Sequence, residues 1–71
     1  MKSITLKAAR TNAGYTQEQL AEAVGVHRQT IQKWEETPSV MSIRNAEKVC
    51  KILKVKMSDI FFGNTLQNGE K

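Results

Sequence analysis

The chain has 71 residues, a length that allows one small domain at most. One cysteine and one histidine exclude an internal disulfide and a structural zinc ion held by several Cys and His ligands, and no apolar run approaches the length of a membrane span. A net charge of +4 at pH 7 favours a polyanionic partner without proving one. The N-terminus also lacks the apolar centre of a signal peptide, so we expect a cytoplasmic protein. We expect no metal or other cofactor.

The positive charges lie mainly in two segments that flank a central stretch. Residues 1–15 carry Lys2, Lys7 and Arg10 without an acidic residue, and residues 44–56 carry five lysines and arginines against Glu47 alone. The stretch between them is net acidic. Any positive surface beside the centre must therefore come from flanking segments that the fold brings together.

A first helix is predicted to begin near Ser3, which can cap it, and to end at Gly14. Arg10 shares the apolar face of this helix, so its guanidinium is expected to be partly buried and to need a carboxylate or phosphate. The apolar positions recur at i, i+3 and i+7: Leu6, Ala9 and Ala13.

A second helix is predicted to follow Thr16, an N-cap residue that forms a capping box with Gln19. Gly25 supplies the residue that can take a positive φ at the helix end. Ala21 is expected at a helix crossing, where a larger side chain would push the two helices apart. One apolar stripe results: Leu20, Ala21 and Val24.

A third helix is predicted from about His27 to Glu36, directly after a tight turn. Trp34 is expected to be a partly buried packing residue, and the opposite face of this helix is polar and basic. The small residue Ala21, then Gly25, then Ile31 is the spacing of a helix-turn-helix. The apolar positions are Val26, Thr30, Ile31 and Trp34.

Pro38 predicts a loop after this pair, and Ser42 restarts a fourth helix over residues 43–53. A short fifth helix around residues 57–62 is expected to return Ile60 and Phe61 to the core, and residues 63–71 form a polar tail that we expect to be disordered. Either Phe61 or Phe62 completes the core, which leaves the other for pairing with a second copy. The core face of the fourth helix is Ile43, Ala46, Val49, Cys50 and Leu53.

The segment AGYTQEQLAEAVGVHRQTIQKWE resembles the helix-turn-helix of the phage-repressor and Cro-like (XRE) family of transcriptional regulators. The resemblance extends over roughly residues 3–62 and implies an all-α, compact five-helix bundle of the lambda-repressor type, with helices two and three as the helix-turn-helix. Two positions depart from the family pattern. His27 stands where Ser or Thr commonly caps the third helix, and Lys54 stands where Gly commonly ends the fourth.

The N-terminal part of the third helix is expected to meet base edges in a major groove. Arg28 can donate two hydrogen bonds to guanine, and Gln29 or Gln32 can pair with adenine. The alternative is that these polar residues are simply the solvated face of an amphipathic helix. The expected base-contacting residues are His27, Arg28, Gln29, Gln32 and Lys33.

Phosphate contacts are expected at two helix starts, because free N–H groups and the helix dipole favour an anion there. Gln17 begins the second helix, and the resemblance implies that it grips the DNA backbone; the alternative is that it merely starts the helix. The resemblance also places Ser42 and Arg44 against a phosphate. For Lys48 and Lys51, DNA contact and a role in solubility are equally good explanations.

The resemblance further supplies Glu35 as the carboxylate partner of Arg10, in an ion pair that sets the angle of the third helix against the first. Without coupling between the two residues, Arg10 is a phosphate contact instead. The structural set is therefore Ala21, Gly25, Ile31, Trp34, Arg10 and Glu35.

The function implied is a sequence-specific regulator that binds double-stranded DNA, with a repressor of a palindromic operator favoured and a weak homodimer completed on DNA. The alternative is an antitoxin-like or anti-repressor module that mainly binds protein. An enzyme is not expected, because the four central glutamates do not converge with a nucleophile. We expect neither a membrane nor a small-molecule ligand as partner.

Overall fold

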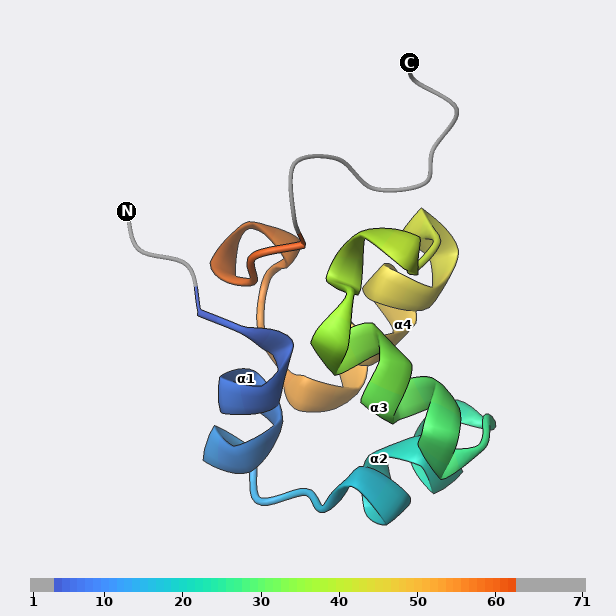
Figure 1. The fold of residues 1–71 in the computed structure, drawn as a ribbon. Helices are drawn as coiled ribbons and strands as arrows, with labels where there is room; N and C mark the ends of the chain where they lie inside the picture. The colour runs from blue at the N-terminus through green and yellow to red at the C-terminus, as the bar shows by residue number, and fades with distance from the viewer. Residues whose placement is uncertain (1–3, 63–71) are drawn as a thin grey trace.

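The computed structural model describes residues 4–62, and this part of the chain folds into helices joined by short turns (Figure 1). Single 3-10 turns form at η1 (Pro38–Val40) and η2 (Met57–Asp59). The predicted all-α class is confirmed for the described residues. These contain four α-helices: α1 (Leu6–Asn12), α2 (Gln17–Val24), α3 (Arg28–Glu36) and α4 (Ile43–Leu53).

The first helix is shorter than predicted at both ends. Thr5 caps α1, because its Oγ1 accepts a hydrogen bond of 3.1 Å from the backbone nitrogen of Ala8. Ser3, the predicted cap, lies outside the described residues. Ala13 was predicted in the core but is exposed, since the helix ends at Asn12 and the buried face continues from Ala9 to Arg10 instead.

The caps predicted for α2 are present. The Gln19 nitrogen donates to Thr16 Oγ1 at 3.0 Å, and the Thr16 nitrogen donates to Gln19 Oε1 at 2.9 Å, which completes the capping box. Gly25 ends the helix with a φ of 93°, and its nitrogen donates to the carbonyl of Ala21 at 2.8 Å. The chain therefore turns sharply into α3 at the predicted glycine.

Both predicted ends of α4 are also present. Ser42 Oγ accepts a hydrogen bond of 3.2 Å from the Asn45 nitrogen at the first turn. Lys54 ends the helix in the left-handed region, with φ 60° and ψ 45°, although lysine adopts that conformation less readily than glycine. The core predicted for α4 is correct except at Ile43, which is only half-buried.

One apolar core joins all four α-helices in the described part of the chain. Met41, which follows η1, is fully enclosed and was not among the predicted core residues. The buried apolar side chains are Leu6, Ala9, Leu20, Ala21, Val24, Ile31, Trp34, Met41, Ala46, Val49, Cys50, Leu53, Ile60 and Phe62.

The fifth helix predicted over residues 57–62 is not formed: η2 is a single turn, and the chain then runs extended to Phe62. Ile60 forms an isolated parallel bridge with Ile4, in which the Phe61 nitrogen donates to the Ile4 carbonyl at 2.9 Å. Because neighbouring side chains of an extended segment point to opposite sides, Ile60 and Phe62 are buried and Phe61 is 51% exposed. The prediction that Phe61 packs inward is therefore wrong. The predicted tail of residues 63–71 lies outside the described residues.

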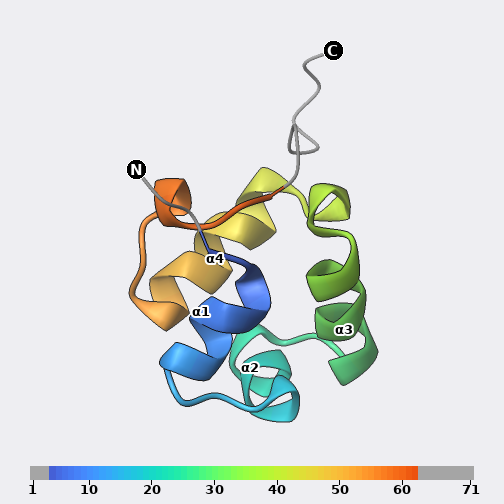
Figure 2. The same cartoon turned by 60° about the vertical axis from the view of Figure 1, so that its left-hand side comes forward.

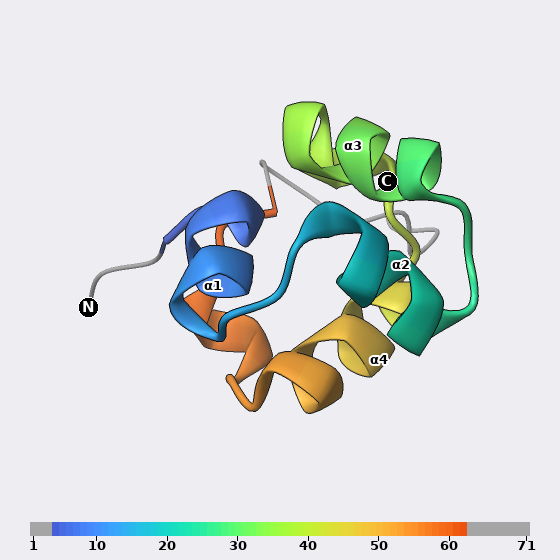
Figure 3. The same cartoon turned by 90° about the horizontal axis from the view of Figure 1, so that it is seen from below.

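The helices α3 and α4 lie on opposite sides of the domain (Figures 2 and 3). Viewed from below, α2 lies between them and α1 lies to one side (Figure 3). The contacts agree with this arrangement, because α2 packs against both α3 and α4. Within residues 4–62, no helix is long and apolar enough to cross a membrane.

Candidate nucleic-acid interface

The helix α3 buries one face and exposes the other. Ile31 is 0% exposed and Trp34 5%, so the apolar face predicted from their spacing is in the core. His27 precedes the helix as its N-cap, and in the described structure its side chain makes no capping hydrogen bond. The residues predicted to contact bases are all exposed at this helix: His27, Arg28, Gln29, Gln32 and Lys33.

An ion pair fixes α3 to α1. Arg10 Nε donates to Glu35 Oε2 at 2.5 Å, and the two side chains are only 9% and 7% exposed. A second guanidinium nitrogen of Arg10 donates to the carbonyl of Tyr15 at 2.8 Å, in the segment between α1 and α2. The predicted pair between Arg10 and Glu35 is thus present, and both side chains are nearly buried where α1 packs against α3.

Gln17 adds α2 to this pair. Its side-chain nitrogen Nε2 donates to Glu35 Oε1 at 2.9 Å, so the two oxygens of one carboxylate bind side chains from two different helices. Sequence reasoning missed this bond, because it placed Gln17 on a DNA phosphate. We call the three side chains of Arg10, Gln17 and Glu35 the three-helix network.

The turn between α2 and α3 needs a glycine for its backbone conformation and not for space. Gly25 has a φ of 93°, and a Cβ added to it would meet no atom within 4 Å among the described residues. Ala21 is 3% exposed on α2, the helix that packs against α3, in agreement with the small residue predicted for a helix crossing. The strain expected of a side chain at Gly25 is therefore torsional.

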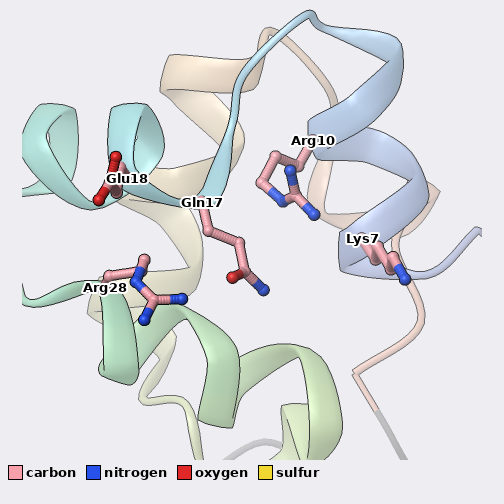
Figure 4. Close-up of a pocket in the computed structure, with 5 residues that line it drawn as sticks. All are labelled: Lys7, Arg10, Gln17, Glu18 and Arg28. Carbon is pink, nitrogen blue, oxygen red and sulfur yellow. The ribbon is translucent and has the colours of Figure 1, made fainter.

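An open hollow of about 530 Å³ lies between α1 and the N-terminal ends of α2 and α3. Figure 4 shows Gln17 between Lys7 and Arg10, which come from α1, and Arg28, which comes from α3. Glu18 lies at the edge of the hollow away from Lys7 (Figure 4). We call this feature the α1–α3 hollow, and its polar lining is suited to an ion rather than to an apolar ligand.

Comparison with known proteins identifies the family. Residues 6–60 match a family model described as Helix-turn-helix, a range that contains all four α-helices. The chain belongs to the XRE-type helix-turn-helix family. It is 44% identical over 57 residues to the HTH-type transcriptional regulator YgzD of Bacillus subtilis, which covers 80% of this chain and 86% of that protein.

Two relatives from Archaeoglobus fulgidus are also named HTH-type transcriptional regulators. One is 36% identical over 56 residues, covering 79% of this chain and 80% of the relative. The other is 35% identical over 66 residues, covering 93% of each chain. Proteins of this helix-turn-helix family are DNA-binding regulators and in general not enzymes.

In this helix-turn-helix domain, the two residues predicted to bind phosphate at α4 differ in their surroundings. The Ser42 hydroxyl caps the helix and is half-buried, so it already has a partner within the protein. Arg44 is exposed one position after the start of α4. Arg44 is thus open to a phosphate, whereas the Ser42 hydroxyl is already engaged in capping α4.

Lys7, like Glu18, lines the α1–α3 hollow although it was not among the site residues predicted from the sequence. It was counted only as part of the basic N-terminal segment, yet it lines the α1–α3 hollow with Arg28 of α3, 21 positions further along the chain. A basic residue on the exposed side of α1 was visible in the sequence. Its nearness to the start of α3 depends on how the helices pack.

Proposed function

We propose that this protein is a transcriptional regulator that binds duplex DNA in a sequence-specific manner and presents α3 to the major groove. The observation that carries the proposal is the two-sided character of α3: its apolar face is buried in the core, while five polar side chains between His27 and Lys33 are exposed. Such a helix can enter the major groove without exposing apolar surface. The family relationship and the relatives named as transcriptional regulators support the same function.

The exposed residues of α3 have the hydrogen-bonding groups that base recognition needs. Arg28 can donate two hydrogen bonds to guanine O6 and N7, and Gln29 or Gln32 can both donate to and accept from adenine. His27 and Lys33 flank them and add contacts to bases or phosphates. Because the three-helix network holds α3 at a defined angle, these side chains approach the groove from a fixed direction.

Phosphate contacts around α3 would set its register on the duplex. Arg44 at the start of α4 is exposed and carries a full positive charge, and the first N–H groups of α2 next to Gln17 favour an anion. Arg10 is better assigned to structure, because its charge is paired with Glu35. Because one proton of the Gln17 amide nitrogen is bonded to Glu35, Gln17 can offer a phosphate only the second amide proton and its backbone N–H.

We further propose that two copies bind a pseudo-palindromic operator and repress by excluding polymerase from it. A single short helix contacts too few base pairs for useful specificity, so a second half-site about 10 base pairs away would supply the rest. Phe61, which is exposed beside the buried Phe62, is the most exposed large apolar side chain among the described residues and is available for pairing. The sequence left open which of Phe61 and Phe62 is exposed, and the burial of Phe62 favours Phe61 for that role.

Selection from a random-sequence duplex pool by electrophoretic mobility shift tests the proposal. We expect enrichment of one sequence made of two related half-sites. If no sequence is enriched although the folded protein is present in excess, the regulator proposal fails and the protein-binding alternative, an antitoxin-like or anti-repressor module, is favoured.

A further inference from the structure

The outward side of α4 carries a row of positive side chains of which the proposed operator contacts use only Arg44. At about 100° per residue, Arg44, Lys48 and Lys51 lie within roughly 60° of one another around the helix axis, and all three are exposed. We call these three side chains the α4 basic row. The opposite side of the helix is buried and consists of Ala46, Val49, Cys50 and Leu53.

The α4 basic row faces away from the helix proposed to contact the bases. The helix α2 packs against both α3 and α4 and lies between them when the domain is viewed from below (Figure 3). Since the buried side of α4 is turned toward the core, its basic side is turned outward, away from α3. Arg44 belongs to the first turn of α4, which follows η1 and the end of α3. A duplex bound at α3 therefore leaves Lys48 and Lys51 exposed.

The positive charges along α4 are not compensated within the described residues. In residues 4–62, neither the Lys48 nor the Lys51 ammonium group takes part in a hydrogen bond or an ion pair. Lys54 and Lys56 follow the helix and are also exposed. Glu47 is the single acidic residue between positions 44 and 56, where five lysines and arginines occur. This side of the domain therefore has an excess of positive charge.

The composition of this surface favours a polyanion over a folded protein. Interfaces between proteins are centred on aromatic or arginine side chains in apolar pockets and are depleted in lysine. The exposed large apolar side chains among the described residues are Val40 and Phe61, and neither belongs to α4. Exposed ion pairs with protein carboxylates contribute little, whereas a lysine that neutralises a DNA phosphate also releases condensed counterions. Duplex DNA thus gains more from this surface than an acidic protein does.

We infer that Lys48 and Lys51 bind phosphates of a second DNA segment while α3 holds the operator. This inference rests on the proposed function. The α4 basic row covers about 10 Å of the helix axis, a length over which duplex DNA carries several phosphate charges. Because lysine contacts a phosphate as a point charge and phosphates carry no sequence information, the second segment needs no defined sequence. One domain then bridges two duplexes, or two distant parts of one duplex.

Capture of a second duplex by the operator complex tests the inference. A duplex with the sequence selected by the wild type is fixed to beads, protein is bound and washed, and a fluorescent duplex of unrelated sequence is added. Wild-type protein should capture the second duplex. The double variant Lys48→Gln, Lys51→Gln should bind the selected duplex as tightly as the wild type. Its affinity for the second duplex should fall roughly 60-fold at about 0.1 M salt, with a slope of log K against log salt reduced by about 1.8.

Three further variants control for charge. Lys48→Arg with Lys51→Arg keeps both positive charges and should retain full capture. Glu47→Gln removes the acidic charge next to the row and should strengthen capture. Lys51→Gln alone should weaken capture roughly eightfold at about 0.1 M salt. Lys7→Gln removes the same charge from α1 and should leave the capture per bead-bound copy of the protein unchanged.

The outcomes separate this inference from the proposed function. Wild-type protein that binds no duplex DNA would overturn both. A wild type that binds its selected duplex but captures no second one would overturn the inference alone. So would a loss of affinity of the Lys48→Gln, Lys51→Gln variant for the selected duplex by itself, because these lysines would then contact the operator.

Two other results would assign the surface differently and also overturn the inference. Extra protein on the beads whenever the second duplex is captured would mean that another copy holds that duplex at its own α3. Binding of a polyglutamate peptide that depends on Lys48 and Lys51, without capture of a duplex, would mean that this side of α4 takes an acidic protein.

Discussion

At the scale of single residues, Lys54 has the most unusual backbone. Its φ of 60° is the left-handed conformation, which costs a residue with a Cβ roughly 1–2 kcal/mol. Glycine avoids this cost but loses more entropy on folding, so Lys54→Gly should raise the free energy of unfolding by about 0.5–1 kcal/mol. Lys48→Gly, in the exposed middle of α4, should lower it by about 1 kcal/mol. Urea unfolding measures both, and a loss in both variants would show that Lys54 is not strained.

Cys50 should be a poorly reactive thiol in the folded protein. Burial raises the pKa of this thiol, and the nearby carboxylate of Asp59 raises it further. Since the thiolate is the reactive form, labelling of the native protein should be slow at neutral pH and should keep rising with pH beyond the range of an ordinary cysteine. A thiol-exchange reagent should label Cys50 rapidly only in urea. Equal labelling rates in native and unfolded protein would contradict its burial.

At the scale of the elements, the three-helix network connects α1, α2 and α3 through one carboxylate. Arg10→Met leaves that carboxylate buried without its counter-charge, and Glu35→Leu does the same to the guanidinium, so each change should cost about 3 kcal/mol. The double variant should be more stable than the sum of the two losses predicts. Recovery should be incomplete, because Gln17 also loses its acceptor on Glu35. Strictly additive losses in urea would mean that the two residues are not coupled.

At the scale of the elements, the sequence predicted the caps and turns that are determined by residues close together in the chain. The capping box of Thr16 and Gln19 and the glycine turn after α2 involve residues at most four positions apart, so local pattern suffices. The bond between Gln17 and Glu35 joins residues 18 positions apart, and the bridge between Ile4 and Ile60 joins the two ends of the domain. Helical periodicity contains no information on such contacts, which is why the fifth helix and the orientation of Phe61 were mispredicted.

At the candidate interface, too, the features set by nearby residues were predictable and the contacts between distant residues were not. The exposed positions of α3 follow from the helical spacing of Ile31 and Trp34, and their exposure agrees with the prediction. The α1–α3 hollow depends on the packing of three helices, so Lys7 was not singled out. The pair of Arg10 and Glu35 was available only through family resemblance, because a buried arginine indicates that it needs an acidic partner but not which one.

At the scale of the whole molecule, the exposed Phe61 is expected to matter only when two copies bind together. Phe61→Ser should reduce the cooperativity of binding to a two-half-site operator, because it removes apolar contact area between copies. Affinity for an isolated half-site should not change. Titration of both duplexes by mobility shift, with footprinting at saturation, measures this effect. A footprint over one asymmetric half-site would dispose of the paired arrangement.

The consensus sequence selected by an Arg28→Ala variant shows whether the exposed side of α3 recognises DNA bases. We expect that variant to lose preference at one base position in each half-site, at a cost of roughly 1–3 kcal/mol, with helicity unchanged. Arg44→Ala should keep the full consensus and weaken all sequences alike, since it is assigned to a phosphate. A consensus from Arg28→Ala identical to that of the wild type would contradict the proposed placement of α3 in the groove.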